Sequence, residues 1–111
     1  MAKSAPYAIF TIDENSIILY ANRAAEKTFG YRLEDLLGKS LTLVMPENLR
    51  EAHRAGIRRF VESGQRRLDW NGIRLPALHK SGRTIQVEIA FEVFYRGEKP
   101  TFTGFAKQVA N

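Results

Sequence analysis

A histidine lies among apolar residues in the stretch Met45–Gly64, which has the pattern of one amphipathic helix. His53 falls four residues after Leu49 and four before Ile57, so helical periodicity turns its imidazole toward the apolar side. An imidazole placed there has two natural roles. It either ligates a metal or cofactor, or it is a core histidine that is hydrogen-bonded to a neighbouring group. The apolar stripe that it shares comprises Leu49, Ile57, Phe60 and Val61.

The sequence does not supply this histidine with a recognisable set of catalytic residues. General acid–base catalysis needs convergent carboxylates or a histidine with a partner, and the acidic residues here fall mostly in turns and on helix exteriors. The chain has no G-x-S-x-G, no Gly-rich phosphate loop and no H-E-x-x-H motif. Its two histidines, without any cysteine, make a poor zinc site. We expect no catalytic activity from this domain alone.

Length and composition indicate a single domain over residues 1–111. Hydrophobic residues at 44% and charged residues at 26% are typical of a globular protein, and no apolar run is long enough to span a membrane. The first residues lack the apolar segment of a signal peptide, so we expect a cytoplasmic protein. The absence of cysteine excludes disulfides and cysteinyl-flavin photochemistry.

The net charge of +5 comes from 17 Lys and Arg against 12 Asp and Glu. Arginines crowd the helix and the residues after it, but no aromatic residues interleave with them as stacking platforms for bases. A solvated helix face is therefore favoured over nucleic-acid binding. The arginines concerned are Arg54, Arg58, Arg59, Arg66 and Arg67.

The pattern before the long helix predicts a β-hairpin and short helices. Aromatic and β-branched residues over Tyr7–Ile12 and Ile17–Tyr20 indicate strands. Asn22 is a good N-cap for a helix over Arg23–Phe29, which Gly30 would end. Another helical turn is expected over Leu33–Leu37.

The pattern after the long helix predicts three strands. Arg67–Leu78 is extended but interrupted near Asn71-Gly72, which indicates a bulge. Thr84–Phe94 alternates cleanly, and Thr101–Val109 closes the chain after a turn over Arg96–Pro100. His79, beside a turn, is expected to be exposed. Strands on both sides of a helical block favour an α+β fold with an antiparallel sheet.

This order, together with four sequence stretches, resembles the PAS sensory domain over essentially the whole chain. The stretches are I-I-L-Y-A-N-R-A-A-E-K-T-F-G-Y at 17–31, E-D-L-L-G-K at 34–39, M-P-E at 45–47 and L-H-K-S-G-R-T-I-Q-V-E-I at 78–89. Within the family, the chain is most similar to the oxygen-sensing haem-PAS domains of bacterial sensor kinases. That similarity rests on Met45, Pro46, Arg50, His53, Ile57, Arg59 and Phe60, and on F-T-G-F at 102–105.

The resemblance implies a five-stranded antiparallel sheet with helices packed on one face around a ligand pocket. It places His53 as the axial ligand of a haem iron and Arg59 as the partner of a haem propionate. Ile57 would also belong to the cofactor-binding site. An apolar distal wall would be formed by Leu68, Ile89 and Phe91. Neutral imidazole is a common proximal haem ligand, and a guanidinium suits a carboxylate.

Two departures separate this chain from the oxygen-sensing kinases. Ile73 stands where those proteins place a distal arginine that hydrogen-bonds oxygen, and isoleucine cannot donate. Gln108-Val109-Ala110 replaces the usual D-[IL]-T at the end of the last strand. Trp70 offers a resemblance to flavin-binding PAS domains, so FAD, or no cofactor, are the alternatives to haem.

The resulting hypothesis is a regulatory sensor module of a bacterial signal-transduction protein. It would bind a small ligand or cofactor and relay the change to an attached output domain of kinase, cyclase or transcriptional-regulator type, as a homodimer. The alternative is a cofactor-free PAS module for protein interaction and dimerisation.

Overall fold

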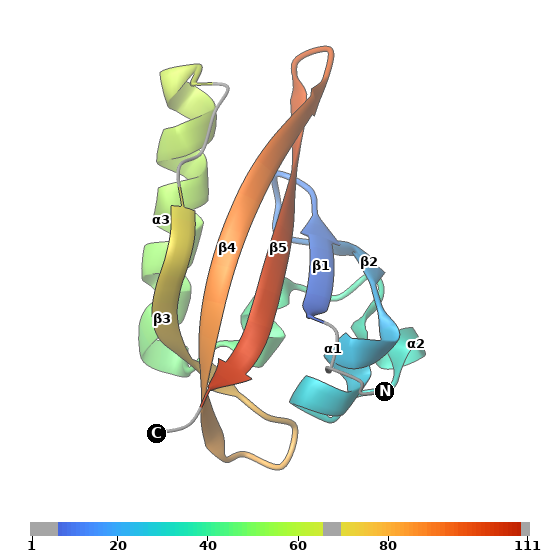
Figure 1. Cartoon of the computed structure of the whole chain (residues 1–111). Coiled ribbons are helices and arrows are strands. Elements are labelled where there is room, and N and C mark those ends of the chain that lie inside the picture. Colours follow the sequence, from blue (N-terminus) through green and yellow to red (C-terminus); the bar gives the residue numbers. More distant parts are fainter. Residues whose placement is uncertain (1–6, 66–69, 110–111) are drawn as a thin grey trace.

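The computed structural model describes residues 7–65 and 70–109 and contains one antiparallel sheet of five strands (Figure 1). The strands lie in the order β2-β1-β5-β4-β3, so the C-terminal strand β5 is central and joins the N-terminal hairpin to the rest. The α+β fold expected from the sequence is confirmed. The strands are β1 (Ala8–Ile12), β2 (Ile18–Ala21), β3 (Trp70–Leu78), β4 (Thr84–Arg96) and β5 (Lys99–Val109).

Four helical segments connect β2 to β3, and two of them, α1 and η1, begin at a side-chain cap. Asn22 Oδ1 accepts a hydrogen bond from Ala25 N–H at 3.0 Å and another from Ile9 N–H at 3.0 Å, so the cap of α1 is also fixed to β1. Figure 1 shows α1 and α2 near β1 and β2, whereas α3 is separate from them, in the part of the view where β3 is drawn. The segments are α1 (Arg23–Phe29), α2 (Leu33–Leu36), the 3₁₀ turn η1 (Leu41–Val44) and α3 (Glu47–Ser63).

The hydrophobic core lies between the helices and one face of the sheet. Phe10 of β1 meets Phe29 of α1 edge-to-face, with ring centroids 5.4 Å apart. Of the α3 side chains, all within the described range 7–65, only Phe60 is buried, and its ring meets Phe102 of β5 at 5.6 Å. Helix α3 is therefore attached to the sheet near its C-terminal end, and its large apolar side chains Leu49, Ile57 and Val61 are half-buried.

One local expectation is confirmed with narrower bounds, and another is wrong. The turn expected over Arg96–Pro100 is present, but it occupies only Gly97-Glu98, because β4 and β5 continue on both sides with Arg96 paired to Lys99. Gly97 has a φ of +62°, and this left-handed backbone conformation permits a turn of only two residues between the strands. His79 was expected to be exposed, but it is half-buried, because its ring packs over Gly30, which has no side chain.

Candidate functional site

An apolar cavity of about 90 Å³ lies between the inner face of the sheet and the helical cover. Strands β1, β3, β4 and β5 form its floor, and α1 and η1 contribute to its roof. A cavity with such an apolar lining can take apolar groups, which make no hydrogen bonds. Its lining includes Phe10, Phe29, Val44, Val87, Ile89 and Phe91.

Phe91 limits the size of this cavity because its ring lies against the backbone of β5. Phe91 and Gly104 are paired across β4 and β5, and a Cβ built on Gly104 would lie 2.9 Å from Phe91 Cε1. Glycine is the residue that permits such a close approach. The ring therefore occupies space that a smaller residue at position 91 would give to a ligand.

His53 does not line this cavity. Its Nε2 lies 2.8 Å from the hydroxyl oxygen of Ser16, which belongs to the turn between β1 and β2. Ser16 is buried, and its backbone has a φ of +65°, the left-handed region. Helical periodicity correctly places His53 on the inner side of α3, where the group that it meets is this hydroxyl.

The electrostatic surroundings of His53 favour a neutral imidazole. Burial, and secondly the positive charge of Arg54, lower its pKa below the usual value of 6.5. A neutral imidazole has a free lone pair, which serves equally to accept a hydrogen bond or to ligate a metal. The protonation state of His53 therefore does not distinguish hydrogen bonding from metal ligation. The geometry around the imidazole has to distinguish these two roles.

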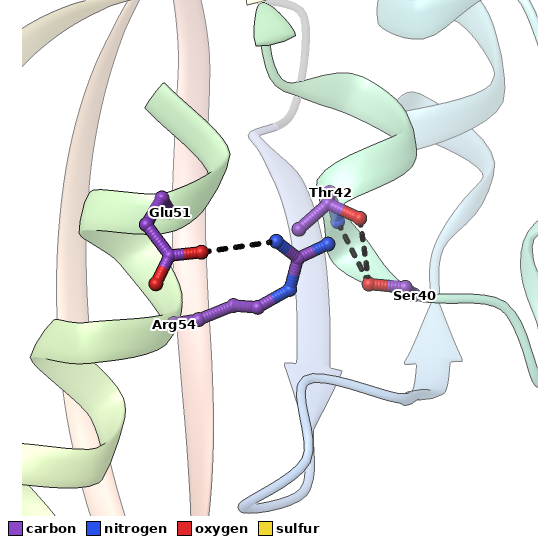
Figure 2. Close-up of polar contacts among 4 residues, drawn as sticks. All are labelled: Ser40, Thr42, Glu51 and Arg54. Atoms are coloured by element: carbon purple, nitrogen blue, oxygen red, sulfur yellow. Dashed lines mark hydrogen bonds and ion pairs between the residues drawn. The ribbon is translucent and has the colours of Figure 1, made fainter. Parts of the chain in front are cut away.

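A second, polar groove of about 350 Å³ lies between α3 and the β1–β2 turn. Arg54 reaches from α3 toward Ser40 and Thr42, while its guanidinium makes a 3.7 Å ion pair with Glu51 (Figure 2). Ser40 Oγ accepts from Thr42 N–H at 3.2 Å, so its hydroxyl caps η1. Ile57 also lines this groove.

The structure disperses the remaining predicted site residues. Ile73 is half-buried on β3 and pairs with Ile89, Arg59 is exposed on α3, and the backbone of Trp70 pairs with that of Phe91. Leu68 lies outside the described residues. Of the predicted set, Ile89 and Phe91 line the apolar cavity, whereas His53 and Ile57 face the β1–β2 turn and the polar groove.

Two residues at these sites were not predicted. Ser16 carries no signal in the sequence, because serine rarely adopts a positive φ and its hydroxyl contacts a residue far along the chain. Gly104 lies within the F-T-G-F stretch, but its contact with Phe91 depends on the register of β4 and β5.

In this conformation the chain does not fit a haem. Pockets that hold ligands and cofactors have volumes of roughly 300–1,000 Å³, several times the volume of the apolar cavity, about 90 Å³. The nitrogen that would ligate iron is hydrogen-bonded to Ser16 and lies outside the cavity. Among residues 7–65 and 70–109, no group of three or more His, Cys, Asp or Glu side chains could hold a metal ion. No helix in these ranges is long and apolar enough to cross a membrane.

Comparison with known proteins agrees with this architecture. The family described as PAS fold matches residues 1–109. Oxygen sensor protein DosP of Escherichia coli is 34% identical over 79 residues, which are 71% of this chain and 10% of DosP. Sensor protein FixL of Bradyrhizobium diazoefficiens is 27% identical over 104 residues, 94% of this chain and 21% of FixL.

A solved PAS domain from Colwellia psychrerythraea superposes with a TM-score of 0.77 at 20% identity, covering 93% of this chain and 86% of that structure. At that identity the likeness shows the fold alone. The chain spans only a small part of DosP and FixL, so their whole-protein activities do not transfer with it. The family match over nearly all residues, with the sheet order and helical cover described above, shows that this chain belongs to the PAS family.

Proposed function

We propose that this chain is the sensory module of a bacterial signal-transduction protein, and that a small apolar ligand in the cavity is its signal. The observation that supports this most directly is the apolar cavity of about 90 Å³ at the centre of the fold. Its floor consists of four of the five strands, so a ligand there acts on the sheet as a whole. A covalently attached output domain and a second copy of the chain, in the cytoplasm, would receive the change.

The sheet offers a route from the cavity to such partners. Alternate residues of β4 face the cavity and the outer surface, so Phe91 lines the cavity while Phe94 is 54% exposed. Tyr20 of β2 is also exposed, at 51%. A ligand that shifts the inner side chains would shift the strands that carry these outer aromatics.

Xenon is a suitable probe of the cavity, since small apolar cavities admit it without hydrogen bonds. We expect xenon to shift the methyl resonances of Val87 and Ile89 in the wild-type protein. We expect Phe91→Ala to enlarge the cavity so that benzene produces the same methyl shifts. Phe94→Ala, on the same strand but the outer face, is the matched control and should leave the xenon response unchanged.

If xenon moved no cavity methyl in the wild-type protein, the ligand function would be wrong. The second candidate, a cofactor-free module for dimerisation and partner binding, would then be preferred. Its specific support is the exposure of Tyr20 and Phe94 on the outer face. Sedimentation of the wild-type protein against Phe94→Ser would test whether a second copy docks there.

Haem is the cofactor that the sequence resemblance to oxygen-sensing haem-PAS domains brings forward, with His53 as ligand and Arg59 toward a propionate. Its binding requires His53 to leave Ser16 and the cavity to open. A hemin titration followed by absorption tests this in wild-type protein and His53→Ala. We expect the conformation described here to make hemin binding weak and dependent on His53. A strong band that persists in His53→Ala would contradict ligation by this residue.

A further inference from the structure

The turn that meets His53 is held by its own hydrogen bonds. Asp13 Oδ1 accepts from Asn15 N–H at 2.8 Å and from Ile17 N–H at 2.9 Å. Ser16 N–H donates to Asp13 O at 3.0 Å, and Leu41 N–H donates to Ser16 O at 2.8 Å. The Ser16 hydroxyl is therefore presented to α3 from a fixed backbone that is also connected to η1.

Ser16 is an unusual residue for this backbone. Its φ of +65° is a conformation in which glycine is favoured and serine is strained. Among the described residues it is the one non-glycine residue with a positive φ. What serine supplies and glycine lacks is the hydroxyl, which is only 2.8 Å from His53 Nε2. Strain at a buried position with a specific partner indicates a role for that partner contact.

The His53–Ser16 contact joins the middle of α3 to the turn between β1 and β2. Phe60 anchors α3 near its C-terminal end, and His53 lies two turns before it. The His53–Ser16 hydrogen bond therefore fixes both the helix and the direction of the imidazole. Arg54, Arg58, Glu14 and Glu62 line the groove beside this contact.

We propose that Ser16 is a positioning residue, which holds the His53 imidazole outside the apolar cavity and thereby decides which ligands the module can take. With the bond intact, the cavity accepts apolar ligands and His53 is not offered to a cofactor. With the bond broken, the imidazole is released for ligation or chemical modification. This inference rests on the proposed sensory function, but its test needs no cavity ligand.

The experiment measures the reactivity of His53 toward diethyl pyrocarbonate, which acylates accessible neutral imidazole nitrogens. Peptide mass spectrometry gives separate rates for His53 and for His79, which serves as the internal reference. We expect His53 in Ser16→Ala to react about fivefold faster than in wild type, the factor that a typical net hydrogen bond contributes. The rate at His79 should not change.

Two further variants distinguish loss of the hydroxyl from general loosening. Ser16→Gly removes the hydroxyl but also relieves the strained φ, which offsets the lost hydrogen bond, so we expect it to fold and to react faster at His53 as well. Ser40→Ala removes another hydroxyl from the same groove, one that caps η1, and should leave the His53 rate unchanged.

An unchanged His53 rate in both Ser16→Ala and Ser16→Gly would overturn the proposal. An equal increase in Ser40→Ala would also overturn it, because the groove as a whole would then control access. Failure of the xenon experiment with success here would remove the ligand function and leave the positioning role of Ser16 in place.

Discussion

Replacing Gly30 with alanine is expected to lower the free energy of unfolding by about 2–5 kcal/mol. Two physical terms add at this position. The φ of +84° is in the left-handed region, which costs an L-residue roughly 1–2 kcal/mol. The new Cβ would also lie 2.5 Å from His79 Cε1 and 2.6 Å from His79 Nε2, and such overpacking costs about 1–3 kcal/mol.

His79 cannot easily move away from the new methyl group. The ring Nδ1 of His79 accepts a hydrogen bond from Ser81 N–H at 3.0 Å, and the backbone N–H of His79 donates to Arg83 O at 2.9 Å. The next residue, Lys80, donates its N–H to Phe29 O at 2.9 Å, which ties the β3–β4 turn to the end of α1. Substitution at Gly30 therefore strains a contact between two distant parts of the chain.

Gly38→Ala is the matched control, measured in the same way by urea denaturation. Gly38 has almost the same φ, +82°, but nothing lies within 4 Å of a Cβ built there. It should show only the conformational cost of about 1–2 kcal/mol. In a His79→Ala background, the cost of Gly30→Ala should fall to that of Gly38→Ala. Equal costs for the two glycines in the wild-type background would show that His79 yields and that the packing argument is wrong.

Local patterns in the sequence predicted most of the helices and strands, although they did not predict the 3₁₀ turn over Leu41–Val44. Alternation over Thr84–Phe94 predicted the strand β4 and its buried side, because the period of two is a property of the strand itself. Asn22 predicted the start of α1, since a cap acts within one helical turn. The PAS resemblance then supplied the sheet, and the strand order confirms it.

The candidate site was less predictable because its contacts join distant residues. Periodicity turned His53 inward but could not say whether it would meet a cofactor or a hydroxyl 37 positions away. The half-burial of His79 depends on the absence of a side chain at Gly30, which no pattern around His79 reveals. Ser16 adopts a backbone conformation that its residue type argues against, so only the three-dimensional arrangement exposes its role.

Phe60→Ala is expected to be the most damaging substitution in α3, with a loss of about 3–5 kcal/mol in the free energy of unfolding. The ring is 9% exposed and meets Phe102 edge-to-face at the centre of the sheet. Arg59→Ala, at the adjacent and exposed position, should change stability by no more than about 0.5 kcal/mol. Phe60→Leu keeps an apolar side chain and should lie between the two.

The same substitution separates the two attachments of α3. With Phe60 removed, α3 keeps the His53–Ser16 hydrogen bond and the half-buried contacts of Ile57 and Val61, and one hydrogen bond contributes only about 1 kcal/mol. Hydrogen exchange of the α3 amides should therefore accelerate strongly in Phe60→Ala, and further in Phe60→Ala with Ser16→Gly. If α3 exchanged at the wild-type rate in Phe60→Ala, Phe60 would not be its anchor. The helix that carries His53 would then have to be held by its half-buried residues, Ile57 and Val61 among them.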